Sequence, residues 1–144
     1  MTASSLQVVF VWGIMSAFTV DMANSPGQLA RLCDVLAARG VNLVVCGLAH
    51  GGGGIIAFIA DDEPAARGAL QAAEIDYVER PALTVRLENV PGAGATAFRK
   101  LAEANVNIDV LLPIRIFDDQ FYAVICPDDL DAAAEALGEQ VVNG

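Results

Sequence analysis

The sequence predicts an α+β protein built from two tandem ferredoxin-like domains, each with the order β-α-β-β-α-β, an antiparallel sheet and two helices on one face. An internal repeat carries this prediction. Residues 17–45 repeat as residues 82–110 at an offset of 65, with twelve identities in the 29 aligned positions. One inserted residue later, residues 55–62 align with residues 121–128. A register held over this length indicates a duplicated unit.

Hydrophobic periodicity predicts the strands of each copy. Apolar and polar residues alternate over 18–22 and 83–88, as in a strand with one buried face. Two hairpins follow, closed by the glycines after His50 and by Asp118-Asp119. Their predicted strands are 41–49, 54–60, 106–117 and 120–126. Fourth strands are expected at 76–79 and 139–142.

Helices are predicted between these strands. In the first copy four residues at i, i+3, i+4 and i+7 form one apolar stripe, and Gly40 stands at the expected C-terminal position. That stripe comprises Leu29, Leu32, Cys33 and Leu36. The stripe of the second copy comprises Phe98, Leu101 and Ala102. Second helices are predicted to start near Glu63-Pro64 and near Asp128-Asp129, where acidic residues suit the helix N-terminus.

The predicted domain boundaries follow from the repeat. We expect an N-terminal tail over 1–15, a first domain over 16–80 and a second over 81–144, with the junction at Arg80-Pro81. Residues 6–15 are mostly apolar, but no basic residue precedes them and they are shorter than the roughly 20 residues that span a bilayer. Two interpretations stay open for this tail: an appended segment with Met15 as the natural start, or an edge strand or partner contact.

Charge and cysteine content exclude several classes of function. The formal net charge of −10 disfavours nucleic acid and anionic membrane partners, since both need a basic face. The three cysteines, Cys33, Cys46 and Cys126, are odd in number and form no CxxC pair, so neither a disulfide framework nor a zinc site is expected. Small buried thiols in a cytoplasmic protein without cofactor or metal are the prediction.

Three apparent motifs are interpreted as structural features without a function of their own. Residues 92–97 satisfy G-x-G-x-x-G/A, but the alternating strand before them is not the doubly buried strand of a dinucleotide fold. His50, the single histidine, has no evident Ser/Asp partners and is interpreted as a hairpin tip. The acidic pairs lack calcium-loop spacing and are interpreted as turn and capping carboxylates. No catalytic residue is therefore predicted.

The sequence Asn-x-Pro-Gly between the first strand and first helix is the most informative motif. It occurs as residues 24–27 and again as residues 89–92. Proline suits a helix start, and Asn24 or Ser25 is a candidate cap. A helix N-terminus also offers unpaired N–H groups to a carboxylate, glycine leaves the backbone open, and an asparagine accepts from an ammonium. These groups match the part common to all amino acids.

With this motif, the LxxLAxxxVN continuation and the repeated element order, the sequence resembles the ACT-domain family of amino-acid-responsive regulatory modules. The first leucine of that continuation is replaced by Cys33 and by Phe98. The second copy is similar to the regulatory tail of aspartate kinases. The resemblance implies amino-acid binding where domains pair. The implied ligand-binding residues are Asn24, Ser25, Gly27, Gln28, Leu29 and Asn42 in the first copy, and Asn89, Val90, Gly92, Ala93 and Asn107 in the second.

Two functions remain open at this point. The first is a non-catalytic sensor that binds a free amino acid and acts on a separate metabolic enzyme, most readily as a homodimer. The second is a pure association module that builds oligomers or docks a partner without a small ligand. The first copy is the favoured binding copy, because Ser25 and Gln28 provide polar groups that Val90 and Ala93 lack.

Overall fold

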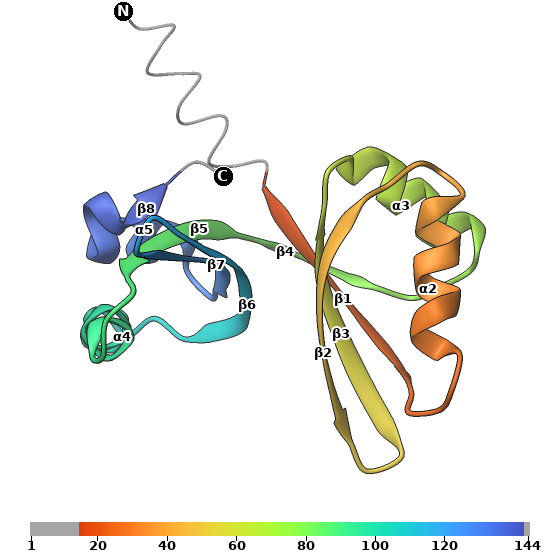
Figure 1. Ribbon diagram of the computed structural model, residues 1–144, viewed down its shortest axis with the longest axis horizontal. Coiled ribbons are helices and arrows are strands. Elements are labelled where there is room, and N and C mark those ends of the chain that lie inside the picture. The colour runs from red at the N-terminus through yellow and green to blue at the C-terminus, as the bar shows by residue number, and fades with distance from the viewer. Residues whose placement is uncertain (1–14, 143–144) are drawn as a thin grey trace, which may run out of the picture. The chain divides into compact units, whose positions relative to one another are not determined.

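Each copy folds as a four-stranded antiparallel sheet with two helices packed on one face, which confirms the predicted fold class (Figure 1). The computed structural model describes residues 15–142. In the first copy the elements are β1 (Ser16–Ala23), α2 (Gln28–Ala37), β2 (Leu43–His50), β3 (Gly53–Ala60), α3 (Glu63–Ala72) and β4 (Val78–Pro81). Its strand order is β2-β3-β1-β4.

The second copy repeats this order as β6-β7-β5-β8. Its elements are β5 (Leu83–Glu88), α4 (Ala93–Glu103), β6 (Ile108–Phe117), β7 (Gln120–Pro127), α5 (Leu130–Leu137), a 3-10 turn (Gly138–Gln140) and β8 (Val141–Val142). One compact unit is Ser16–Arg80, and residues 81–142 with Met15 form the other. The rest of the predicted tail lies outside the described residues. No helix within 15–142 has the length and apolarity needed to cross a membrane.

Each of the two units is stabilised by its own hydrophobic core. In the first, the Phe18 and Phe58 rings stack with centroids 5.1 Å apart, and the Tyr77 ring lies 5.8 Å from Phe18. Leu36 and the equivalent Leu101 of the second unit are each at most 1% exposed. Aromatic pairs at this spacing add stabilisation beyond their burial. Each unit therefore has its own hydrophobic core.

The helix boundaries follow the local signals in the sequence. Gly40 has φ 69°, and the N–H groups of Gly40 and Val41 donate to Ala37 and Leu36, which is the Schellman pattern expected after a helix. Asn105, with φ 57°, takes this position in the second copy. Asp62 and Asp129 cap the second helices by accepting from Ala65 and Ala132. The predicted stripe at Phe98 was partly wrong, because Ala97 is buried there and Ala102 is exposed.

The alignment of the later strands was wrong by one residue. Asp61 accepts from the N–H of Asn42, and Asp128 accepts from the N–H of Asn107. These equivalent carboxylates are 67 positions apart, so the second copy has two extra residues rather than one. Both lie in β6, where the register with β7 shifts between Ile108 and Val110 and between Pro113 and Arg115. The extra residues are thus two β-bulges, and the hairpin turns keep the same length.

Two further expectations need correction. The fourth strand begins at Val78 rather than at residue 76, because Tyr77 packs against Phe18 and the N–H of Ile75 donates to Leu70 at the end of α3. Among the cysteines, only Cys126 is buried. Cys46 is exposed, because it lies on an edge strand with its side chain on the face opposite the helices.

Candidate functional site

The Asn-x-Pro-Gly motif forms a tight turn that leads into the first helix of each copy. The N–H of Gln28 donates to the Ser25 carbonyl at 3.4 Å, and Gly27 has φ 89° and ψ −11°. The second copy repeats this with a bond from Ala93 to Val90 and φ 89° at Gly92. These are type II turns, in which proline favours the second position and glycine the third. The expected side-chain cap was wrong, since neither helix has one.

This turn keeps the start of α2 uncovered. A Cβ built on Gly27 would meet no atom within 4 Å. The backbone N–H of Asn24 donates to the Gly52 carbonyl at 3.0 Å, which ties the turn to the β2–β3 hairpin. Within residues 15–142 the Asn24 amide makes no hydrogen bond, and the residue is exposed. The amide is therefore free to meet a ligand beside the helix N-terminus.

A cavity of about 330 Å³ lies between this turn, α2 and the β2–β3 hairpin. Four of the predicted site residues line it: Asn24, Ser25, Gln28 and Leu29. The remaining walls are apolar or backbone and comprise Met22, Ala23, Val45, Gly47, Leu48, Ala49, Gly54, Ile55 and Ile56. Its volume is at the small end of ligand pockets, which hold about 300–1,000 Å³.

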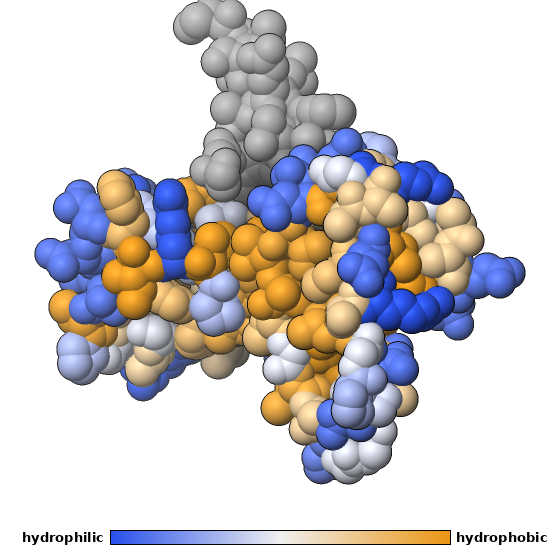
Figure 2. Space-filling model, turned by 45° about the vertical axis from the view of Figure 1, so that its right-hand side comes forward, coloured by the Kyte–Doolittle hydropathy of each residue, from blue (hydrophilic) through white to orange (hydrophobic). Residues whose placement is uncertain are grey.

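The cavity combines polar groups at one end with an uncharged apolar wall. None of its lining residues carries a charge. Leu29 is 45% exposed and Ile55 43%, so apolar surface stands open to water around it. Figure 2 shows hydrophobic surface along the projecting β2–β3 hairpin. Such a site suits a small ligand that has polar atoms at one end and a neutral, apolar part at the other.

Asn42 and Asn107 lie apart from this cavity. Asn42 precedes β2, five positions before Gly47, and both its N–H and its carbonyl bond to Asp61. In the second copy the Asn107 amide also donates to the Asp109 carboxylate at 2.9 Å. These bonds join the start of one strand to the end of its hairpin partner. Gly27 supports the turn without lining the cavity.

The second copy has a different wall at each equivalent place. Gly94 replaces Leu29, and the Phe98 ring lies 3.5 Å from where a Cβ of Gly94 would stand. Pro113, flanked by a bulge, takes the place of Gly47. Val90 and Ala93 replace the polar Ser25 and Gln28. Asn89 and Gly92 keep the turn, but the polar groups and the bulge-free strand beside it are specific to the first copy.

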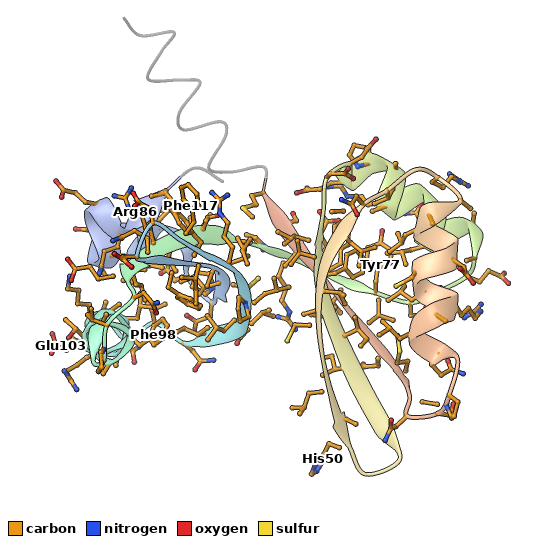
Figure 3. All side chains as sticks on the ribbon, in the orientation of Figure 1. His50, Tyr77, Arg86, Phe98, Glu103 and Phe117 are labelled. Carbon is orange, nitrogen blue, oxygen red and sulfur yellow. The ribbon has the colours of Figure 1, made fainter. Side chains whose placement is uncertain are left out.

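Ionisable groups take no part in the cavity. His50 lies at the tip of the β2–β3 hairpin, as predicted (Figure 3). The resolved pKa shifts belong to the ion pair of Arg67 and Glu79, on another part of the first unit. The hydrogen bond donated by Arg67 lowers the pKa of the Glu79 carboxyl, and the same bond raises the pKa of Arg67. Among the described residues no cluster of His, Cys, Asp or Glu has the composition of a metal site.

The strand wall of the cavity was missed by the sequence analysis. Val45, Gly47, Leu48 and Ala49 all come from β2. A glycine inside a strand is a recognised sign of close approach, and Gly47 carries it. A Cβ there would stand 2.5 Å from Cδ1 of Ile56, so glycine leaves room for that side chain. A pocket wall that comes from another strand has no local signature beside the motif, so the motif alone predicts only the turn.

The architecture is two tandem ferredoxin-like units with the same strand order. No family model matches the sequence, and no curated protein matches it. Solved structures do share the fold. The protein BT0572 from Bacteroides thetaiotaomicron aligns with a TM-score of 0.77 at 24% identity, covering 88% of this chain and 90% of its own.

Two further neighbours carry a description of their role. The regulatory subunit of aspartate kinase from Thermus thermophilus aligns with a TM-score of 0.65 at 21% identity, covering 88% of this chain and 91% of its own. A C-terminal regulatory domain assigned to aspartate kinase from Porphyromonas gingivalis aligns with a TM-score of 0.56 at 12% identity, covering 90% and 94%. At these identities the likeness establishes the shared fold.

Proposed function

We propose that this chain is a non-catalytic regulatory module that binds a free, uncharged-side-chain amino acid in the cavity of its first copy. One observation carries the proposal: an open helix start and three polar side chains meet an uncharged apolar wall in a single cavity. The fold shared with aspartate kinase regulatory subunits supports a regulatory role. Regulation would act on a separate metabolic enzyme.

The polar end of the cavity matches the zwitterionic end of an amino acid. The carboxylate binds the N–H groups that follow Pro26, where the helix start has free donors and partial positive charge. The ammonium is bound by the Asn24 amide oxygen and by nearby backbone carbonyls. Ser25 and Gln28 add further donors and acceptors at the same end. No metal or cofactor is needed for this recognition.

The apolar wall selects the ligand side chain. A charged side chain would lose water without finding a partner, because the lining residues are uncharged. A small aliphatic side chain instead covers Leu29 and Val45, which both lie on the helix-covered face of the sheet. We therefore expect aliphatic and small neutral amino acids to bind, and acidic and basic ones to bind weakly.

A thermal-shift screen against the twenty amino acids tests this function. At a ligand concentration of 100 times Kd, binding stabilises the folded state by about 2.7 kcal/mol, which raises Tm by several degrees. The expected hits are neutral aliphatic amino acids. Their amides, which lack the carboxylate, are the matched controls and should have little effect. If none of the twenty raises Tm, the chain is an association module without a small ligand.

A further inference from the structure

The inner strand β1 of the first sheet is covered along only half of one side. β1 has eight residues, whereas its neighbour β4 has four. The Thr19 hydroxyl donates to the Val78 carbonyl at 3.5 Å, so β4 begins beside Thr19 and runs back toward the start of β1. Residues 20–23 of β1 therefore pair with β3 on one side and with no strand of residues 15–142 on the other. We call this open side of residues 20–23 the free edge of β1.

Backbone groups point outward along the free edge of β1. The N–H of Asn24 donates to the Gly52 carbonyl, in the register of the β1–β3 ladder. Because the bonding direction alternates along an antiparallel ladder, the even-numbered residues of β1 bond to β3. The N–H and carbonyl groups of Asp21 and Ala23 consequently face away from β3, and they form no hydrogen bond with the other described residues. Such an unpaired edge is a template for an added strand.

A cavity of about 240 Å³ lies beside this edge, between β1, α2 and the loop that leads into β4. Its apolar lining residues are buried or half-buried, and its charged ones are exposed. The apolar residues are Val20, Met22, Leu32 and Ile75, and the others are Asp21, Gln28, Arg31, Glu74 and Asp76. The four charged side chains form no hydrogen bond or ion pair within residues 15–142. The cavity therefore offers an apolar floor surrounded by unpaired charges.

Alternation along β1 determines which side chains an added strand needs. Val20 belongs to the core under the helices, so Asp21 has its side chain on the opposite face of the sheet. Directly opposed residues of an antiparallel pair share a face. A residue placed opposite Asp21 thus has its side chain beside the Asp21 carboxylate, and the residues before and after it face the apolar floor of the cavity. A lysine or arginine between two apolar residues matches these surroundings.

We propose that the free edge of β1 binds an extended segment of another protein, in which apolar residues flank a lysine or arginine that pairs with Asp21. Strand addition of this kind takes its affinity from main-chain hydrogen bonds and its specificity from alternate side chains. The carboxylates of Asp21, Glu74 and Asp76 outnumber the single Arg31, so the edge favours a basic segment. The proposal goes beyond amino-acid binding and does not depend on it.

Charge distinguishes this occupant from two others. The chain has no lysine or arginine before Arg31, so its own N-terminal residues cannot supply the basic residue. A second copy of the chain has a net charge of −10 and is repelled.

The second unit does not offer the same edge. There β8 pairs with Thr84 and Val85, and the next residue is Arg86, which takes the place of Asp21. Thr96 replaces Arg31, and Ala93 replaces Gln28. A basic segment would meet a like charge at Arg86, so the proposed edge is specific to the first unit.

Titration calorimetry of the full chain with the probe peptide acetyl-Thr-Val-Lys-Val-amide tests the proposal. The peptide spans residues 20–23, with its lysine opposite Asp21 and its valines toward the cavity. We expect saturable binding, weakened roughly tenfold when the peptide lysine is replaced by glutamate. Methylation of the main-chain nitrogen of that lysine removes its bond to the Asp21 carbonyl and should abolish binding. No saturable binding of the probe, or equal affinity of the methylated peptide, overturns the proposal.

A matched pair of charge reversals tests where the peptide binds. Asp21→Lys should weaken the lysine peptide roughly tenfold and strengthen the glutamate peptide. Asp34→Lys is the control, because Asp34 is an exposed aspartate of α2 that does not line the cavity, and the change in net charge is the same. Equal effects of the two variants would show that net charge alone attracts the peptide, which contradicts the proposal. Circular dichroism checks the fold of each variant, and the methylated peptide decides the question on the unaltered chain.

The outcomes separate this edge from the proposed amino-acid site. Met22 and Gln28 line both cavities, so the two sites are neighbours. Asn24→Ala, which alters the amino-acid site alone, should leave the affinity for the peptide unchanged. A loss of peptide binding in that variant would place the peptide in the turn cavity and overturn the proposal. Peptide binding by a chain that binds no amino acid supports the edge and refutes the proposed function, and amino-acid binding without peptide binding does the reverse.

Discussion

Gly27 and Gly92 set the direction in which the chain enters α2 and α4. Both have φ 89°, and a Cβ at either position would meet no atom within 4 Å. The cost of a side chain there is thus backbone strain without steric clash. For an L-residue, this left-handed conformation costs about 1–2 kcal/mol. The motif is explained locally by the turn, and the open space beside it is what a ligand can use.

We expect Gly27→Ala and Gly92→Ala each to lower the free energy of unfolding by about 1–2 kcal/mol, measured by urea denaturation. Gly52→Ala is the control, because Gly52 also faces open space but has no left-handed φ. It should change stability by less than about 0.5 kcal/mol. Equal costs for Gly27→Ala and Gly52→Ala would contradict this explanation of the turn.

The ion pair between Arg67 and Glu79 gives stability a pH dependence. The Arg67 guanidinium donates two bonds of 2.7 Å to Glu79 and lowers the pKa of that carboxyl from its ordinary 4.5. A lowered folded-state pKa means that the stabilisation is complete above the ordinary value and is lost as pH falls through the lowered one. Because the Arg67 side chain is 36% exposed, solvent screens the pair.

Glu79→Gln should therefore cost about 0.5–1 kcal/mol at pH 7 and progressively less as the pH falls below 4.5, as read from urea unfolding at a series of pH values. Glu88→Gln is the control, since the Glu88 side chain makes no hydrogen bond or ion pair within 15–142. It should show little effect at either pH. A Glu79→Gln cost that stays constant down to pH 2 would show that packing, and not the charge, is responsible.

At the scale of the element, β2 differs from β6 in one pair of facing residues. Gly47 faces Ile56 in the first copy, and Pro113 faces Ala123 in the second. A Cβ on Gly47 would collide with Cδ1 of Ile56. The Ile56 residue is buried, with 8% of its surface exposed. The two copies thus keep the combined bulk of the pair by exchanging it between strands.

This exchange predicts coupling between the two positions. Ile56→Val removes the colliding Cδ1 and should cost about 0.5–1.5 kcal/mol in the parent chain. In the Gly47→Ala background it should cost at least about 0.5 kcal/mol less, as determined by a double-mutant cycle of urea unfolding. Additive effects would mean that Ile56 simply rotates away from the added methyl group.

The strands and helices were predictable because their hydrophobic periodicity is visible in the sequence. The bulges of β6 were not predictable in this way. The two bulged residues of β6 are Asp109 and Ile114. An alignment by identity locates an inserted residue only where the flanking residues match, and most of the residues that flank these two differ from their counterparts in β2. The hydrogen bonds of Asp61 and Asp128 fix the register instead. The site residues in the turn were predictable from the Asn-x-Pro-Gly motif. The site residues in β2 were not, because only the tertiary fold brings that strand next to the turn.

At the scale of the whole molecule, the two units have separate cores. Leu36 and Leu101 occupy equivalent positions, 0% and 1% exposed, in clusters that share no residue. Cavity formation at either should cost about 2–5 kcal/mol. Because neither cluster contains residues of the other, we expect the loss to be largely local.

Native-state hydrogen exchange measures this locality. Leu36→Ala should accelerate exchange mainly within residues 16–80, and Leu101→Ala mainly within residues 81–142. Each variant serves as the control for the other. Uniform acceleration across both units by either variant would show that they unfold as one cooperative body.

The central claim is that a neutral amino acid binds at the turn of the first copy. Calorimetric titration of the best ligand from the screen into the parent chain, Asn24→Ala and Asn89→Ala tests it most directly. Removing one hydrogen bond to a charged group costs about 1.5–3 kcal/mol, or roughly tenfold to a hundredfold in Kd. We predict that loss for Asn24→Ala and an unchanged Kd for Asn89→Ala. An unweakened Asn24→Ala, or a loss confined to Asn89→Ala, would contradict the account.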